Sequence, residues 1–239
     1  MYLNMSEELS NFLGVLSSVC YVVLYIPQIY NIYKLKISSG FSILFLMLWT
    51  TGDTSNLICV GAQKPLMTNL LIIGITCSTM TYCLYTFVLY YYTYKHDFNR
   101  LFIVSSSIVL ICIQISSILT IYFYEIDTDS KEFIADVFIW IYMITIISSK
   151  IPQIYKNYKK KEIYELSLYL HIFSFLGNVL YVVSIFTYQE GLDNIIRNIY
   201  WIVSGIILAL LDIVLMTQWL IYYKRPEISD EVEISTIEL

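Results

Sequence analysis

Charged residues are scarce in this sequence of 239 residues. Asp, Glu, Lys and Arg make up 14% of the chain and hydrophobic residues 58%, whereas about a quarter of the residues in a soluble domain are charged. An ordinary soluble helical protein is excluded, because helices that are apolar on every face need a surrounding shell of amphipathic ones. Four uncharged stretches are each long enough to cross a bilayer as a helix: Leu9–Tyr33, Pro65–Tyr94, Leu101–Tyr124 and Leu166–Gln189.

Residues that commonly carry catalysis or bind metals are also few. The chain has two histidines, and its five cysteines lie in or beside the apolar stretches without metal-ligand spacing. No paired-aspartate motif and no serine with a nearby base is apparent, so we expect no enzyme activity, no metal and no cofactor. No basic surface indicates nucleic acid.

Three further apolar stretches carry an ionisable residue well inside them. Phe41–Ala62 contains Asp53, Ile134–Asn157 contains Lys150, and Asn198–Tyr223 contains Asp212. With these the sequence predicts seven transmembrane helices and therefore an all-α, polytopic membrane protein.

The placement of basic residues predicts the orientation, because short cytoplasmic loops carry the excess of Lys and Arg. Alternate connections put three basic residues on one side, Lys64, Lys131 and Arg197. They put ten on the other: Lys34, Lys36, Lys95, Arg100, Lys156, Lys159, Lys160, Lys161, Lys224 and Arg225. We expect a lumenal amino terminus and a cytosolic carboxyl terminus.

An internal repeat organises the chain. At a constant offset of 125 residues, Pro27-Gln28-Ile29-Tyr30 matches Pro152-Gln153-Ile154-Tyr155. Phe41-Ser42 matches Leu166-Ser167, and Gly52-Asp53 matches Gly177-Asn178, in the same register. Because no gap is needed, duplication explains the match better than chance similarity.

The offset also predicts the topology. Two three-helix units joined by one extra helix have the same orientation, so they are parallel repeats with a solute site between them. We expect a first repeat at residues 1–94, a connector with the fourth helix at 95–132, a second repeat at 133–226 and an acidic cytosolic tail at 227–239.

A proline inside a membrane helix leaves a backbone carbonyl without its donor. Pro27 does this to Val23 and Pro152 to Ser148, and in lipid such groups need protein or water partners. Each proline is followed by a glutamine, which offers both donor and acceptor atoms. The sequence therefore predicts a hinge at Pro27 and another at Pro152.

The three intramembrane charges need partners or a cavity, because a charge at the bilayer centre costs at least about 2.5–3.5 kcal/mol. From their depths along the spans we predict a structural or gating ion pair between Lys150 and Asp212, which leaves Asp53 to meet a cationic substrate or a proton. The alternative pairs Lys150 with Asp53 and leaves Asp212 free. His171 is expected to be a hydrogen-bonded residue near the cytosolic surface.

Two PQ motifs in a three-plus-one-plus-three arrangement resemble the PQ-loop family, which includes cystinosin and relatives of the SWEET sugar carriers. The stretch Trp49-Thr-Thr-Gly52-Asp53-Thr-Ser-Asn56-Leu57 resembles the pattern after the first PQ in lysosomal and vacuolar cationic amino-acid transporters. Lys150-Ile-Pro152-Gln153, Leu166-Ser167-Leu168, Gly177-Asn178 and Tyr181 resemble the same branch. In one departure, Lys150 stands where that branch commonly has arginine.

The resemblance implies a SWEET-like fold and alternating access that moves arginine, lysine or histidine from an acidic organelle, the lysosome or vacuole, to the cytosol. The candidate substrate-binding residues are Asp53, Asn178, Gln28, Gln153, Trp49, Asn56 and Tyr181. The expected partners are a cationic amino acid, the lipid bilayer, protons and a cytosolic regulatory protein. The alternatives are a proton symporter for cystine and a nutrient-sensing scaffold that recruits cytosolic partners.

Overall fold

The computed structural model describes residues 2–35, 41–62, 68–96, 128–163, 166–188 and 198–223, with the isolated positions 105, 108, 109, 112, 192, 195 and 196. Within these ranges the chain is helical apart from short connecting stretches and one isolated bridge between Ile163 and Tyr223. The helices are α1 (Tyr2–Val23), α2 (Tyr25–Leu35), α3 (Ile43–Ala62), α4 (Thr68–His96), α6 (Thr128–Lys160), α7 (Leu168–Thr187) and α9 (Ile199–Tyr222). The expected span Leu101–Tyr124, apart from four isolated positions, and the tail at 227–239 lie outside the described residues.

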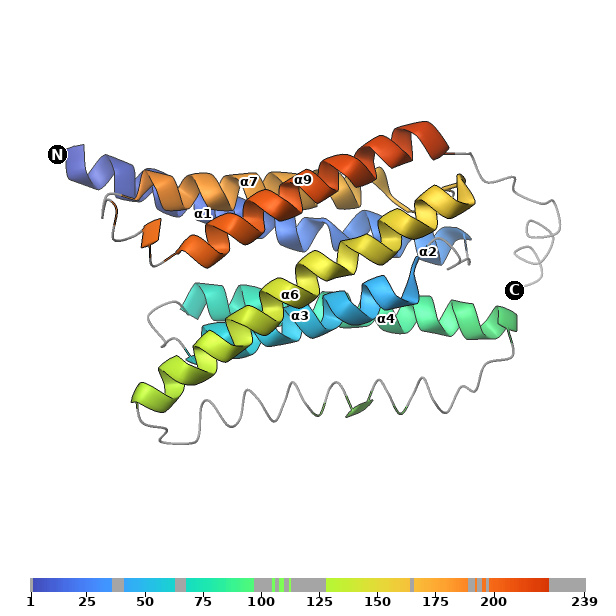
Figure 1. Ribbon diagram of the computed structural model, residues 1–239, viewed down its shortest axis with the longest axis horizontal. Helices are drawn as coiled ribbons and strands as arrows, with labels where there is room; N and C mark the ends of the chain where they lie inside the picture. The colour runs from blue at the N-terminus through green and yellow to red at the C-terminus, as the bar shows by residue number, and fades with distance from the viewer. Residues whose placement is uncertain are drawn as a thin grey trace.

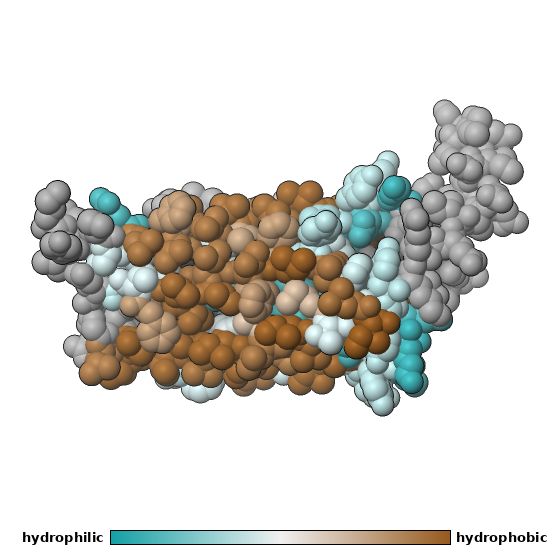
Figure 2. Space-filling model, turned by 90° about the horizontal axis from the view of Figure 1, so that it is seen from above, coloured by the Kyte–Doolittle hydropathy of each residue, from teal (hydrophilic) through white to brown (hydrophobic). Residues whose placement is uncertain are grey.

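The surface has the polarity of a membrane protein. Among the described residues, five helical segments are long and apolar enough to cross a bilayer: Ser6–Lys34, Ile43–Ala62, Asp129–Lys160, Leu168–Thr187 and Ile199–Tyr222. Large apolar side chains such as Phe12, Ile144 and Leu210 are more than half exposed. Apolar residues cover most of the face in Figure 2, and hydrophilic residues gather mainly at one end. This distribution fits a chain whose exterior meets lipid along its length.

The two sequence repeats pack against each other through their helices. The helices run lengthwise, and α1 packs along α7 while α3 packs along α6, so each of these contacts joins one repeat to the other (Figure 1). Within the repeats, α3 packs on α4, and α9 packs on both α7 and α6. The hydroxyls of Ser10 and Ser17 on α1 donate to the carbonyl oxygens of Ser184 and Gly177 on α7, each at 2.8 Å.

Equivalent glycines allow these close contacts between the repeats. Gly52 on α3 lies against Ile146 of α6, and a Cβ at this position would lie 3.4 Å from the Ile146 Cβ. Gly177 on α7, 125 positions later, lies against the Tyr21 ring, where a Cβ would come within 3.0 Å of the ring. Tyr21 and Ile146 are themselves 125 positions apart, so the two contacts repeat each other.

The two PQ segments differ in helical continuity. The first is interrupted at Leu24, which separates α1 from α2 although the Leu24 N–H still donates to the Cys20 carbonyl at 3.1 Å. In the second, Pro152 lies inside the continuous helix α6. The pentapeptides Ile-Pro-Gln-Ile-Tyr are identical in the two segments, so these five residues alone do not determine the difference.

The largest apolar cluster lies where α2, α3, α4 and α7 meet. Its members are almost fully buried and include Tyr25, Ile32, Phe45, Leu46, Leu84, Val88, Leu166 and Leu170. A smaller cluster of Cys59, Ala62, Ala135 and Ile139 joins the end of α3 to the start of α6. The larger cluster lies at the end of the helices for which the sequence predicts a cytosolic location.

We predict that Gly177→Ala destabilises the protein by about 1–3 kcal/mol, because the added methyl group overpacks against a rigid aromatic ring. The matched control is Gly14→Ala on α1, where the nearest atom to a new Cβ is the Ser184 hydroxyl at 4.0 Å. That control should be neutral or stabilising by about 0.5–1 kcal/mol through helix propensity. Thermal unfolding in detergent compares the two variants, and equal midpoints would contradict the close contact.

Candidate functional site

The residues two positions before each PQ proline both donate a hydrogen bond to a carboxylate on another helix. Tyr25 precedes the first motif, and its hydroxyl donates to Asp53 Oδ2 at 3.1 Å. Lys150 precedes the second motif, and its Nζ forms an ion pair with Asp212 Oδ1. Tyr25 and Lys150 are equivalent by the 125-residue offset. The same position of the repeat therefore carries a neutral hydroxyl donor in the first repeat and a cationic donor in the second.

Asp53 is on α3, and its side chain contacts one residue of α2 and one of α4. The Thr81 hydroxyl on α4 contacts the same Oδ2 atom, and the Tyr25 and Thr81 oxygens are 2.6 Å apart. None of the ion pairs found within the described ranges involves Asp53. This carboxylate therefore has two hydroxyl partners and no cationic partner among the described residues.

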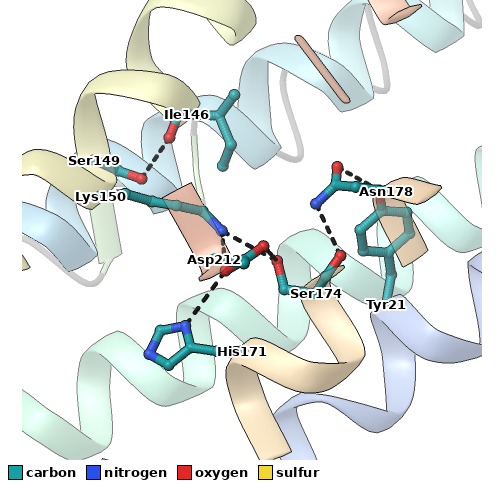
Figure 3. Close-up of polar contacts among 8 residues, drawn as sticks. All are labelled: Tyr21, Ile146, Ser149, Lys150, His171, Ser174, Asn178 and Asp212. Atoms are coloured by element: carbon teal, nitrogen blue, oxygen red, sulfur yellow. Dashed lines mark hydrogen bonds and ion pairs between the residues drawn. The ribbon is translucent and has the colours of Figure 1, made fainter. Parts of the chain in front are cut away.

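Asp212 is the centre of a second polar cluster, in which side chains of α6 and α7 converge on α9 (Figure 3). The carboxylate is fully buried, and the Ser174 hydroxyl donates to its Oδ2 at 2.7 Å. His171 Nδ1 lies 3.4 Å from Oδ1. Breaking a buried ion pair of this kind is strongly destabilising, because it leaves one charge uncompensated.

His171 differs from the expectation for it. We expected a hydrogen-bonded residue near the surface, but only 2% of His171 is exposed, and its Nε2 has no hydrogen-bond partner in the described part of the chain. The equivalent residue in the first repeat, Leu46, is also buried, so this position is buried in both repeats.

Asn178, the repeat equivalent of Asp53, continues the second cluster toward α1. Its Nδ2 donates to the Ser174 carbonyl at 2.8 Å, and its Oδ1 accepts from the Tyr21 hydroxyl at 2.9 Å (Figure 3). Tyr21 and Tyr25 are one helical turn apart on either side of the break at Leu24. Because one tyrosine reaches Asn178 and the other reaches Asp53, both equivalent positions lie next to this break.

The other candidate residues continue the same faces of α3 and α7. Trp49, Asp53 and Asn56 have the i, i+4, i+7 spacing of one helix face. Trp49 stacks on Tyr25 at 5.5 Å between ring centroids, and the buried Oδ1 of Asn56 has no partner among the described residues. Tyr181, equivalent to Asn56, meets the ring of Trp201 edge-on. The face thus offers a carboxylate, an amide and aromatic rings.

Gln28 on α2 and Gln153 on α6 lie apart from this face. Gln28 lies beside the start of α7, and Gln153 lies beside the start of α3. Both side chains are fully buried. Gln28 Oε1 accepts from the backbone N–H of Ser167, and Gln153 Oε1 accepts from that of Ser42, both at 2.8 Å. The structure therefore brings Lys150 and Asp212 together, places Asp53 and Asn178 beside the break at Leu24, and separates the two glutamines from both.

Several residues that hydrogen-bond in the site were not predicted from the sequence. They are Tyr21, Tyr25, Thr81, Ser174 and, through their backbone N–H groups, Ser42 and Ser167. The repeat offset contained a signal for Tyr25, because it occupies the position of Lys150. Thr81 had no such signal, since its repeat equivalent is Ile206.

Comparison with known proteins gives one family and one fold. The profile of the PQ loop repeat matches residues 9–65 and 134–192. The human protein named lysosomal amino acid transporter 1 homolog is 24% identical, over 95% of this chain and 87% of its own. The vacuolar lysine transporter YPQ1 of Saccharomyces cerevisiae is 22% identical, over 92% and 96% respectively.

A solved structure of a eukaryotic SWEET transporter matches with a TM-score of 0.59 at 12% identity. The match covers 91% of this chain and 98% of that structure. It confirms the predicted all-α, SWEET-like membrane fold, and the PQ loop repeat match confirms the family resemblance drawn from the sequence.

We predict that Asp212→Asn or Lys150→Met alone destabilises the protein by about 3–5 kcal/mol, because each leaves the other charge buried and unpaired. The double variant should be much closer to the wild type, since it contains neither charge. Thermal unfolding in detergent measures all three, with Lys159→Met at an exposed position as the control that should change stability by less than about 0.5 kcal/mol. Additive losses in the double variant would show that the two side chains are not coupled.

Proposed function

Because this chain belongs to the PQ-loop family, we propose that it is a membrane transporter that moves cationic amino acids from the lumen of a lysosome or vacuole to the cytosol. Two relatives that align over most of this chain are named as a lysosomal amino acid transporter homolog and a vacuolar lysine transporter. These names support an amino acid as the substrate and an acidic organelle as the location.

The observation that carries the proposal is the carboxylate of Asp53. Lys150 and Asp212 neutralise each other. Of the three intramembrane charges, the negative charge of Asp53 is therefore the one left without an opposite charge. An unpaired intramembrane charge is expensive and usually faces a substrate path. A bound amino acid with a net charge of +1 neutralises Asp53, whereas a zwitterion or a sugar does not.

Neighbouring polar groups suit the rest of an amino acid. The Oδ1 atom of Asn56 is a buried acceptor, and a substrate ammonium group has three donors to offer it. The Asn178 amide and the Tyr181 hydroxyl, on the equivalent face of α7, supply groups for the carboxylate. Trp49 lies one helical turn before Asp53 on α3, and its ring stacks on Tyr25, whose hydroxyl donates to Asp53.

The hinge proposed at Pro27 acts directly on this site. The break at Leu24 lies between Tyr21 and Tyr25, whose hydroxyls bind Asn178 and Asp53. A change of angle at the break therefore moves one tyrosine relative to the other. Pro152 lies two residues after Lys150, so bending of α6 there acts on the ion pair with Asp212 instead.

We predict that Asp53→Asn reduces uptake of radiolabelled arginine into proteoliposomes by at least 100-fold while the protein still inserts and folds. Asn keeps the shape of Asp and removes the charge, so the loss reports on charge recognition. Asp136→Asn, which changes an exposed acid on α6, is the matched control and should retain activity. Transport that survives in Asp53→Asn would refute the assignment.

Competition separates this proposal from the cystine and proton symporter. A lone carboxylate also suits a proton, and in that case cystine would inhibit arginine uptake or replace arginine as the substrate. We expect lysine and histidine to compete with arginine, and cystine and sugars to have no effect. Binding of arginine without flux would instead indicate a sensing scaffold.

A further inference from the structure

The helices α3 and α7 both begin inside the protein. Their starts are preceded by Phe41 and Leu166, each 2% exposed, and Ser167 at the start of α7 is 4% exposed. The first N–H groups of a helix have no partner within the helix, so a buried start needs acceptors from elsewhere. Water can supply them at an exposed start but not at the buried Ser167, and Ser42 at the start of α3 is only partly exposed.

At each start one acceptor is a PQ glutamine, and each glutamine belongs to the opposite repeat. Gln28 of the first repeat accepts from the N–H of Ser167 in the second, and Gln153 of the second accepts from the N–H of Ser42 in the first. The two glutamines are 125 positions apart, as are the two serines. The pair of contacts therefore has the symmetry of the repeat itself.

Each contact resembles one half of a capping box, in which a Glu or Gln at the third helical position accepts from the backbone N–H of the N-cap residue. At the third position after Ser42 and Ser167 these helices have Phe45 and Leu170, which cannot do so. Instead, the PQ glutamine of a different helix provides the acceptor oxygen. Helix capping and contact between the repeats thus depend on the same hydrogen bond.

We propose that Gln28 and Gln153 form a cross-repeat clasp, defined by the bonds Gln28–Ser167 and Gln153–Ser42, that holds the two repeats together at the buried starts of α3 and α7. On this proposal the glutamines are positioning residues and not ligands of the substrate. The clasp keeps this end of the protein closed, and it must open when the repeats separate there. It does not depend on the identity of the substrate.

The surroundings of the clasp support this role. The carbonyl oxygens just before the two serines are also bound by side chains of the second repeat: Phe41 O accepts from Lys156 Nζ, and Leu166 O accepts from Trp219 Nε1 at 2.8 Å. The large apolar cluster of α2, α3, α4 and α7 adjoins these residues. Polar and apolar contacts therefore close the same end of the helices.

The test is hydrogen exchange by mass spectrometry on the full-length protein in lipid nanodiscs without substrate. In Gln28→Met we expect amide exchange to accelerate about tenfold or more at the start of α7, the factor that corresponds to one lost buried hydrogen bond. In Gln153→Met the same acceleration should appear at the start of α3. Each effect thus appears in the repeat that was not mutated.

Two further variants control the experiment. Gln28→Glu keeps an acceptor oxygen and should restore slow exchange at the start of α7, and it should also restore folding if Gln28→Met fails to fold. Ser204→Ala removes another buried hydrogen bond, the one from its hydroxyl to the Trp201 carbonyl on α9, and should leave both helix starts unchanged. Acceleration confined to the mutated repeat, or none at either start, would overturn the clasp. Because no substrate is present, this result is independent of any failure to transport arginine.

Discussion

Lipid supplies no hydrogen bonds, so every polar group within a membrane protein must find its partner in the protein. This constraint accounts for most of the specific contacts in the chain. Lys150 and Asp212 neutralise each other, buried helix starts take their acceptors from glutamines, and serines on α1 bind carbonyl oxygens of α7. Among the three intramembrane charges of the described residues the exception is Asp53, which has hydroxyl partners and no described cation, and the proposed substrate is the group that completes it.

The two repeats share their packing contacts but differ in their intramembrane charged residues. The glycines at 52 and 177, the glutamines at 28 and 153 and the serines at 42 and 167 make the same contacts twice, because both halves face the same packing problem at the interface of the repeats. The ionisable groups inside the spans do not repeat. Lys150, Asp212 and His171 are matched by Tyr25, Phe87 and Leu46. The second repeat therefore holds a neutral ion pair, and the first holds the lone acid.

Composition and the constant offset were enough to predict the class of fold, because apolar length and repetition are properties of the sequence alone. The offset also predicts which residues are equivalent, but it does not predict whether a side chain contacts its own repeat or the other one. Gln28, a candidate substrate-binding residue, bonds a serine in the other repeat. The identical Ile-Pro-Gln-Ile-Tyr segments likewise lie in one interrupted and one continuous helix, so a short motif alone does not predict the path of its helix.

The separation of the two carboxylates has a consequence for the proposed transport of a cationic amino acid. An acid already paired with a lysine has little affinity left for a cationic cargo, so Asp212 suits a structural role and Asp53 a recognition role. With a substrate of charge +1 at Asp53, the three intramembrane charges and the cargo sum to zero. Rearrangement of the repeats then moves no uncompensated charge within the low-dielectric interior, where such a movement is costly. The empty protein retains the charge of Asp53, and this favours rearrangement with cargo over rearrangement without it.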